Sequence, residues 1–232
     1  MKTVKKWFRF ILKFIVVIIL IPVPLVVIFK WIDPPSSSYI LQHHISNLFK
    51  KNECNSVLHE WKDIDKISQN LAMAVISSED QKFATHYGFD FESVKQVILS
   101  KRKKLRGAST ISQQVARNLF LWSGRSWIRK GAEAYITVLI EMFWSKKRIL
   151  EVYVNIAQFG ECVYGAEAAA KYYFGKNASR LSVNQAAMMA AVLPNPVRFR
   201  LNRPSNYILR RTGWITLQFN QLGGKSYLEQ IW

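Results

Sequence analysis

Two adjacent acids, Glu79 and Asp80, end an apolar run and are the first residues in this sequence that could do acid–base chemistry. Phe83, His86 and Gly88 follow them. Burial beside apolar residues raises the pKa of a carboxyl group, and such a group can serve as a general base or acid. We therefore expect a catalytic carboxylate here, and the competing interpretation is a pair of acids held at a helix end by caps and basic neighbours.

A second polar segment, residues 107–118, reads GASTISQQVARN. It places hydroxyl groups and free amide groups at a helix start and a cation one turn further on. Such a start suits a phosphate or pyrophosphate, because the unpaired amides and the helix dipole both favour an anion. The candidate anion ligands are Ser109, Thr110, Gln113, Gln114, Arg117 and Asn118. The competing interpretation is an ordinary helix cap, since Thr110-Ile-Ser-Gln113 also fits a capping box.

More cations follow at Arg125, Arg129 and Lys130. Arg129 precedes Glu133 by one helical turn, so a guanidinium and a carboxylate can pair there. A plain surface salt bridge is the simplest explanation of that spacing. Further along, Asn155 is expected to be a buried polar strut.

The elements that must position these residues are helices. Apolar residues recur at three-to-four spacing from Ile67 to Ser78, and Gly88 closes that stretch. Further helices are expected over residues 110–121, 127–144, 147–159, 164–174 and 182–193, and Ser182-Val-Asn-Gln185 fits a second capping box at the start of the last one. No sustained alternation of apolar and polar residues appears, so the predicted fold class is all-α.

The N-terminus carries a membrane signal. Residues 14–29 contain no charge, and Ile11 and Leu12 extend the apolar run past Lys13, which is long enough to span a bilayer. The basic residues before the run place the N-terminus in the cytoplasm. We expect a cytoplasmic N-terminus and anchor over 1–33, a linker or juxtamembrane segment over 34–48, and one catalytic domain over 49–232. A cleaved signal peptide is the alternative.

Charge restricts the partners further. The 232 residues include 33 Lys and Arg against 15 Asp and Glu, a net charge of +18. A basic domain outside the membrane is a poor match for nucleic acid and a good match for anionic lipid or a lipid-linked phosphate. Residues 100–106, SKRKKLR, either form a solvated face or rest on lipid. Cys54 and Cys162 lie in a compartment that permits a disulfide, and no metal-ligand spacing occurs.

Five blocks in this order resemble the motifs of the bacterial peptidoglycan glycosyltransferases, in the form that lacks a transpeptidase domain. They are EDQKFATHYG (79–88), GASTISQQVARN (107–118), RKGAE (129–133), KRILEVYVN (147–155) and GAEAAAKYYFGK (165–176), the last continuing as LSVNQAAMMAAVLPNPVRF. The resemblance implies a lysozyme-like helical domain behind a single membrane helix. Two positions depart from the family pattern, with Arg117 in place of Lys and Gln185 in place of Glu.

The resemblance also implies roles. Glu79 would deprotonate the 4-hydroxyl of the acceptor lipid II, Asp80, Phe83 and His86 would shape that site, and Glu133 would assist near the donor phosphates or orient substrate. The pyrophosphates would be held by Ser109, Thr110, Gln113, Gln114, Arg117, Asn118, Arg125, Arg129 and Lys130. The acceptor oxygen would attack the anomeric carbon of the growing chain and release undecaprenyl pyrophosphate with inversion.

The implied partners are lipid II, the lipid-linked glycan chain and the membrane, with cell-wall synthesis or division proteins left open. No cofactor is required by the sequence, and a divalent cation at the pyrophosphate stays open. Three other readings compete: a membrane-anchored muramidase, a penicillin-binding transpeptidase and a non-catalytic membrane scaffold. The transpeptidase is disfavoured because its S-x-x-K, S-x-N and K-T-G elements do not occur in order.

Overall fold

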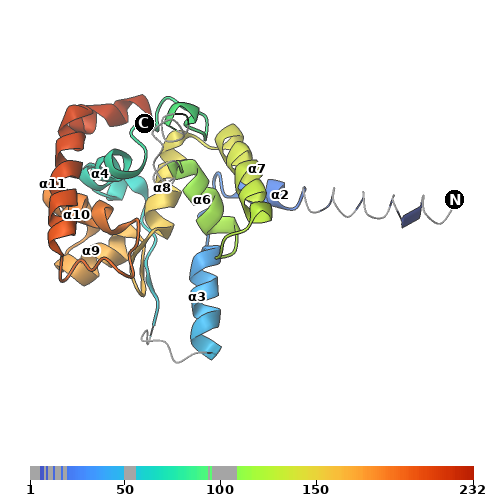
Figure 1. Cartoon of the computed structure of the whole chain (residues 1–232), viewed down its shortest axis with the longest axis horizontal. Coiled ribbons are helices and arrows are strands. Elements are labelled where there is room, and N and C mark those ends of the chain that lie inside the picture. Colours follow the sequence, from blue (N-terminus) through green and yellow to red (C-terminus); the bar gives the residue numbers. More distant parts are fainter. Residues whose placement is uncertain are drawn as a thin grey trace.

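The computed structural model describes Lys6, Trp7, Arg9, Lys13, Val17 and residues 20–49, 56–93, 95 and 109–232. The α-helices are α2 (Pro22–Ile28), α3 (Ser38–Phe49), α4 (Gln69–Glu79), α6 (Ile111–Phe120), α7 (Trp127–Phe143), α8 (Lys146–Ile156), α9 (Ala166–Phe174), α10 (Val183–Val192) and α11 (Asn206–Gln221). Three 3-10 segments, η1 (Ile64–Lys66), η2 (Ala178–Arg180) and η3 (Gly224–Gln230), complete the helical part. Figure 1 shows these elements around α8, with α11 at one side of the molecule and α7 at the other.

Serine and threonine side chains begin most of these helices. Ser68, Ser126, Ser145 and Ser205 each accept a hydrogen bond from a backbone amide of the first turn. Complete capping boxes open α6, with Thr110 and Gln113, and α10, with Ser182 and Gln185. These boxes satisfy amides that would otherwise lack a partner, and they form where the sequence predicts them.

The helices are accompanied by a small sheet. The sequence does not predict this sheet. Strands β1 (Leu58–His59), β2 (Gln158–Gly160) and β3 (Val163–Tyr164) lie in the order β1-β3-β2. β1 runs parallel to β3, and β2 runs antiparallel to it. The prediction of an all-α fold is confirmed in that the domain is mostly helical. The strands were not predicted, because two or three residues are too short to show alternation.

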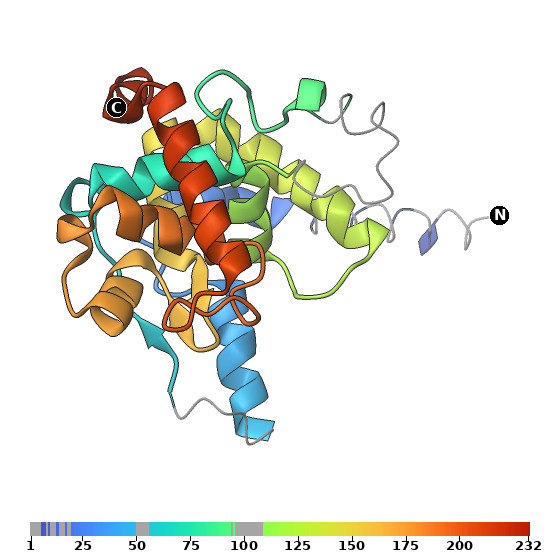
Figure 2. The same ribbon diagram turned by 60° about the vertical axis from the view of Figure 1, so that its left-hand side comes forward.

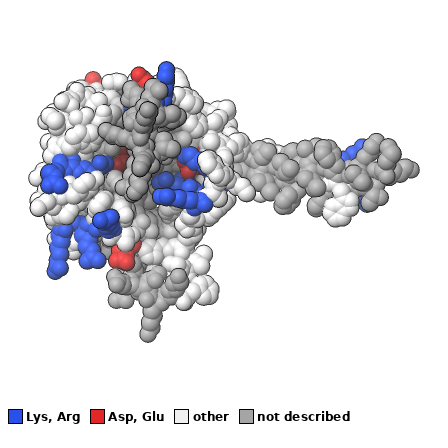
Figure 3. Space-filling model, viewed as in Figure 1, with Lys and Arg blue, Asp and Glu red and all other residues white. Residues whose placement is uncertain are grey.

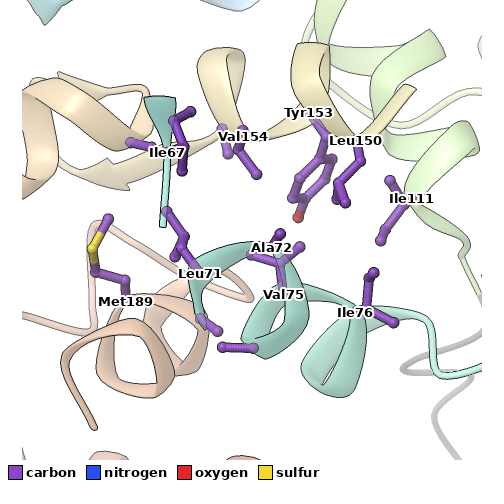
Figure 4. Packing of buried hydrophobic residues seen from close by; sticks show 14 of the residues in the cluster. Ile67, Leu71, Ala72, Val75, Ile76, Ile111, Leu150, Tyr153, Val154 and Met189 are labelled. Carbon is purple, nitrogen blue, oxygen red and sulfur yellow. The ribbon is translucent and has the colours of Figure 1, made fainter. Parts of the chain in front are cut away.

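The core surrounds α4, whose residues 71–77 are all buried. α4 packs against α10 and α11, and α6 packs against α7 and α8. Figure 4 shows Ala72 and Val75 of α4 facing Leu150 and Tyr153 of α8, with Met189 of α10 beside Leu71. Figure 2 shows α11 crossing in front of α4. The end of α4 thus lies where both groups of helices meet.

The first described helix, α2, is docked on the domain. It packs against α7, and Trp144 donates its indole N–H to the carbonyl oxygen of Val26 at 2.7 Å. Arg148 of α8 holds the chain just after α2, with Nη1 2.7 Å from a carboxylate oxygen of Asp33 and Nε 3.0 Å from the carbonyl of Phe29.

Among the described residues, no helix has the length and apolar character needed to cross a bilayer. Residues 11, 12, 14–16, 18 and 19 of the predicted span lie outside the described part of the chain, so the span stays a prediction. Other predictions also concern residues outside the described part of the chain, namely the basic segment 100–106, Gly107, Ala108 and Cys54. Cys162 is disulfide-bonded. The expected linker over 34–48 contains most of α3, which packs against α6.

Candidate active site

Glu79 is the last residue of α4, and its side chain is 13% exposed. Its Oε1 accepts a hydrogen bond from the Ser78 hydroxyl at 3.0 Å, and its Oε2 accepts one from Nε2 of Gln114 at 3.0 Å. The guanidinium of Arg211 approaches Oε1 at 3.5 Å. Two hydrogen bonds, from α4 and α6, and one ion pair, from α11, therefore hold this partly exposed carboxylate.

Asp80 follows Glu79 directly, but its carboxylate is hydrogen-bonded to other groups of the protein. It accepts hydrogen bonds from Nε2 of His86 at 2.9 and 3.0 Å and from the backbone amide of Ile111 at 2.9 Å. The amide of Gly88 donates to Nδ1 of His86 at 3.1 Å, so the ring proton lies on Nε2 and points at Asp80. Asp80 and His86 thereby fix the loop 80–88 to the start of α6.

Several residues that were predicted to bind substrate likewise have side chains that contact the protein itself. The Phe83 ring is fully buried, with Nζ of Lys146 4.7 Å from its centroid. Thr110 caps α6 and also donates its hydroxyl to the carbonyl of Gly88 at 2.6 Å, while Gln113 completes the capping box. The cap that was the competing interpretation of this segment is therefore present. The positive φ of Gly88, +81°, explains glycine at that turn.

Gln114 joins the second predicted segment to the base. Besides its bond to Glu79, it accepts a hydrogen bond from the Tyr153 hydroxyl at 3.3 Å. Burial, and secondly the charge of Glu79, raise the pKa of Tyr153 well above its ordinary value, so the hydroxyl keeps its proton and can donate. Tyr153 was not among the predicted site residues, because its spacing from Ile149, one helical turn, is that of an ordinary core position.

The positively charged side chains on α6, on α7 and between them differ in solvent exposure. Ser109, Arg117 and Asn118 are partly exposed, and Arg117 donates through Nε to Oδ1 of Asn118 at 3.1 Å. Arg125 is exposed in the connection from α6 to α7. Figure 3 shows clusters of Lys and Arg side chains on the face that it draws, with Asp and Glu side chains between them. This part of the chain can offer positive charge to an anion.

Glu133 is buried on α7 with 1% of its surface exposed. The expected pair forms, with Nη1 of Arg129 3.2 Å from its Oε2, and Lys130 contacts its other oxygen. Arg129 is 8% exposed, and its Nε has no hydrogen-bond partner among the described residues. Within the described part of the chain Glu133 and Glu79 share no partner, so the two acids occupy separate networks.

Sequence reasoning missed Ser78 and Arg211 as site residues. Arg211 lies in the middle of α11 and donates from Nη2 to the Ser78 hydroxyl at 2.9 Å. It is one of five arginines between residues 198 and 211. No local pattern distinguishes it from Arg210 beside it; only the packing of α11 on α4 does.

Two further features lie outside this site. A cavity of about 390 Å3 lies between β1, the β2–β3 turn, α9 and residues 196–202, and it includes none of the predicted site residues. Over the described residues, no group of His, Cys, Asp and Glu is arranged to hold a metal ion.

Comparison with known proteins shows which family the chain resembles. The transglycosylase family model matches residues 45–220. A biosynthetic peptidoglycan transglycosylase of Pseudomonas putida (strain W619) is 50% identical over 209 residues, covering 89% of this chain and 88% of that relative. A protein of the same name from Pseudomonas entomophila (strain L48) is 49% identical, covering 90% of this chain and 89% of that relative. Another, from Xanthomonas campestris pv. campestris (strain B100), is 48% identical, covering 85% of this chain and 81% of that relative.

Proposed function

The chain belongs to the transglycosylase family and is a peptidoglycan glycosyltransferase, and we propose that it polymerises lipid II with Glu79 as the general base. The observation that carries the proposal is the contrast between two adjacent acids. The Asp80 side chain is 3% exposed and bonded to His86 and Ile111, whereas the Glu79 side chain at the end of α4 is 13% exposed. A base must reach its proton within hydrogen-bonding distance, which the position of Glu79 allows.

In the proposed reaction Glu79 takes the proton from the 4-hydroxyl of the acceptor sugar. The freed oxygen forms a bond to the anomeric carbon of the lipid-linked chain. The bond from that carbon to the phosphate oxygen breaks, and undecaprenyl pyrophosphate leaves with its electron pair, so the anomeric configuration inverts. Hydrogen bonds from Ser78 and Gln114 keep the carboxylate in one orientation for this step.

The leaving group needs positive charge, because pyrophosphate gains negative charge as the bond breaks. We assign that role to Arg117, Arg125 and Lys130, whose side chains are exposed in part or in full. Glu133 is buried against Arg129 and Lys130. Its proposed role is to position the side chains of these two residues. Phe83, Thr110 and Gln113 have internal roles and are left out of direct substrate contact.

Location follows from the substrate and from the sequence. We propose that residues 1–33 contain a single membrane anchor with its N-terminus in the cytoplasm, and that the domain from 49 onward faces outward, where lipid-linked sugar is polymerised. The 34–48 segment would be juxtamembrane. The docking of residues 26–33 on α7 and α8 supports this arrangement, because it keeps the domain close to the anchor.

The test uses the purified full-length protein in detergent with lipid II as substrate. The wild type should form glycan polymer, Glu79→Gln should form none while keeping its melting temperature, and Glu161→Gln, an exposed acid elsewhere, should behave as wild type. Polymer formation by Glu79→Gln would exclude Glu79 as the base. Release of muropeptides from sacculi without polymerisation would instead indicate the muramidase.

A further inference from the structure

The C-terminal segment lies against the loop that follows the proposed base. Tyr227 of η3 is 7% exposed, and its hydroxyl contacts that loop at both ends of one turn. The backbone amide of Ala84 donates to the hydroxyl oxygen at 3.1 Å, and the hydroxyl donates to the carbonyl of Gln81 at 3.0 Å. A single side chain thus satisfies two backbone groups of the loop 80–88.

A second contact from the same region reinforces the first. Nε2 of Gln81 donates to the carbonyl of Ser77 at 3.1 Å and to Oε1 of Gln218, on α11, at 3.1 Å. η3 and α11 both pack against α4. Figure 2 shows the C-terminal end of the chain above α4, beyond the end of α11. Gln218 and Tyr227 therefore hold the chain just after the end of α4.

The hydroxyl of Tyr227 must keep its proton to make both bonds. Burial is the main influence on it and raises the pKa of Tyr227, while the bond from the Ala84 amide opposes this rise. A tyrosine in this state is protonated at neutral pH, so it donates to Gln81 while accepting from Ala84.

We propose that Tyr227 is a positioning residue for catalysis, which holds the loop 80–88 so that Glu79 and the Asp80–His86 pair keep their geometry. This inference rests on the proposed role of Glu79 as base. It goes beyond the motifs, because Tyr227 lies past residue 220, where the family match ends. The physical reason is that a small displacement of a catalytic group lowers the rate strongly, even when substrate still binds.

The experiment compares two full-length variants that each lose one buried hydroxyl and keep the ring. Tyr227→Phe removes both loop contacts. Tyr164→Phe is the matched control, because Tyr164 is 4% exposed and its hydroxyl bonds to Nδ1 of His43 at 3.0 Å, away from the loop. Steady-state kinetics with lipid II and hydrogen exchange at the Ala84 amide are measured for both, with Gln218→Ala as a second loop variant.

We expect kcat of Tyr227→Phe to fall about tenfold with KM within about twofold of wild type. Exchange at Ala84 should become faster in this variant alone, and Gln218→Ala should show a smaller fall in kcat. Unchanged kcat in Tyr227→Phe would overturn the proposal, and so would an equal fall in Tyr164→Phe, which would indicate general loosening. If Glu79→Gln retains activity, the proposed base fails, whereas wild-type kcat in Tyr227→Phe with an inactive Glu79→Gln removes only the role of Tyr227.

Discussion

At the scale of single residues, neighbours in sequence have different environments. Glu79 and Asp80 are adjacent, yet Asp80 accepts hydrogen bonds from His86 and Ile111 while Glu79 meets side chains from three helices. The sequence motif was enough to point to this pair. The residue types and spacing alone could not tell the partly exposed acid from the one that fixes the loop, because that difference depends on which helix ends meet there. Only the family resemblance assigned the role of base to Glu79.

Arg211 yields a prediction at this scale. Its guanidinium lies 3.5 Å from Glu79 and donates to Ser78, so Arg211→Ala should disturb the orientation of the base. A hydrogen bond from a charged donor contributes about 1.5–3 kcal/mol, so kcat should fall roughly 10- to 100-fold. Arg211→Lys should recover only part of that loss, because a single ammonium group replaces a planar fork.

The measurement is the rate of lipid II polymerisation at saturating substrate, with melting temperature as the check on folding. Arg210→Ala provides the matched control, since it removes the same charge from the exposed neighbouring position on α11. If both variants lose the same activity, Arg211 acts only through the general positive charge of this surface.

At the scale of elements, helix starts were the most predictable feature. Both capping boxes form, because a cap needs only a hydroxyl and a partner three residues later. The strands were not predictable, since β1 pairs with β3 through residues far apart in sequence, Leu58 with Val163. Arg211 and Tyr227 escaped prediction for the same reason: packing of α11 and η3 on α4 brings them to the site.

The start of α6 combines structure and function in one side chain. Thr110 caps the helix and bonds to the carbonyl of Gly88, so Thr110→Val loses both hydrogen bonds at nearly constant volume. We expect a loss of about 1–2 kcal/mol in the free energy of unfolding, measured by urea denaturation. Ser205→Ala, which removes only the cap of α11, should cost less. Equal losses would show that the contact with Gly88 contributes nothing.

At the scale of the whole molecule, one buried amide ties the strand region to the helical core. Asn155 of α8 donates to the carbonyl of Lys62 at 2.8 Å and accepts from the amide of the same residue at 2.8 Å. The carbonyl of Asn155 also lies 3.1 Å from Nε2 of His59 on β1. The expectation of a buried polar strut describes this residue well, although its partners lie far away in sequence.

The same connection predicts how stability depends on pH. Burial lowers the pKa of His59 despite its bond to Asn155, and burial also lowers the pKa of His43, which bonds to Tyr164. Each folded pKa lies below the unfolded value of about 6.5, so the unfolded chain binds protons first as pH falls. The stabilisation is fully present above about pH 7 and is lost as pH falls below the unfolded pKa towards the folded pKa.

Urea denaturation from pH 7.5 to 5.5 measures this effect. The free energy of unfolding should decrease over that range in the wild type, and the double variant His43→Gln with His59→Gln should show a smaller decrease. Because the site residues Glu79 and Arg211 lie on other elements, Glu79→Gln should keep the wild-type pH slope. A double variant with the wild-type slope would assign the loss of stability to other groups and would remove the two histidines as its cause.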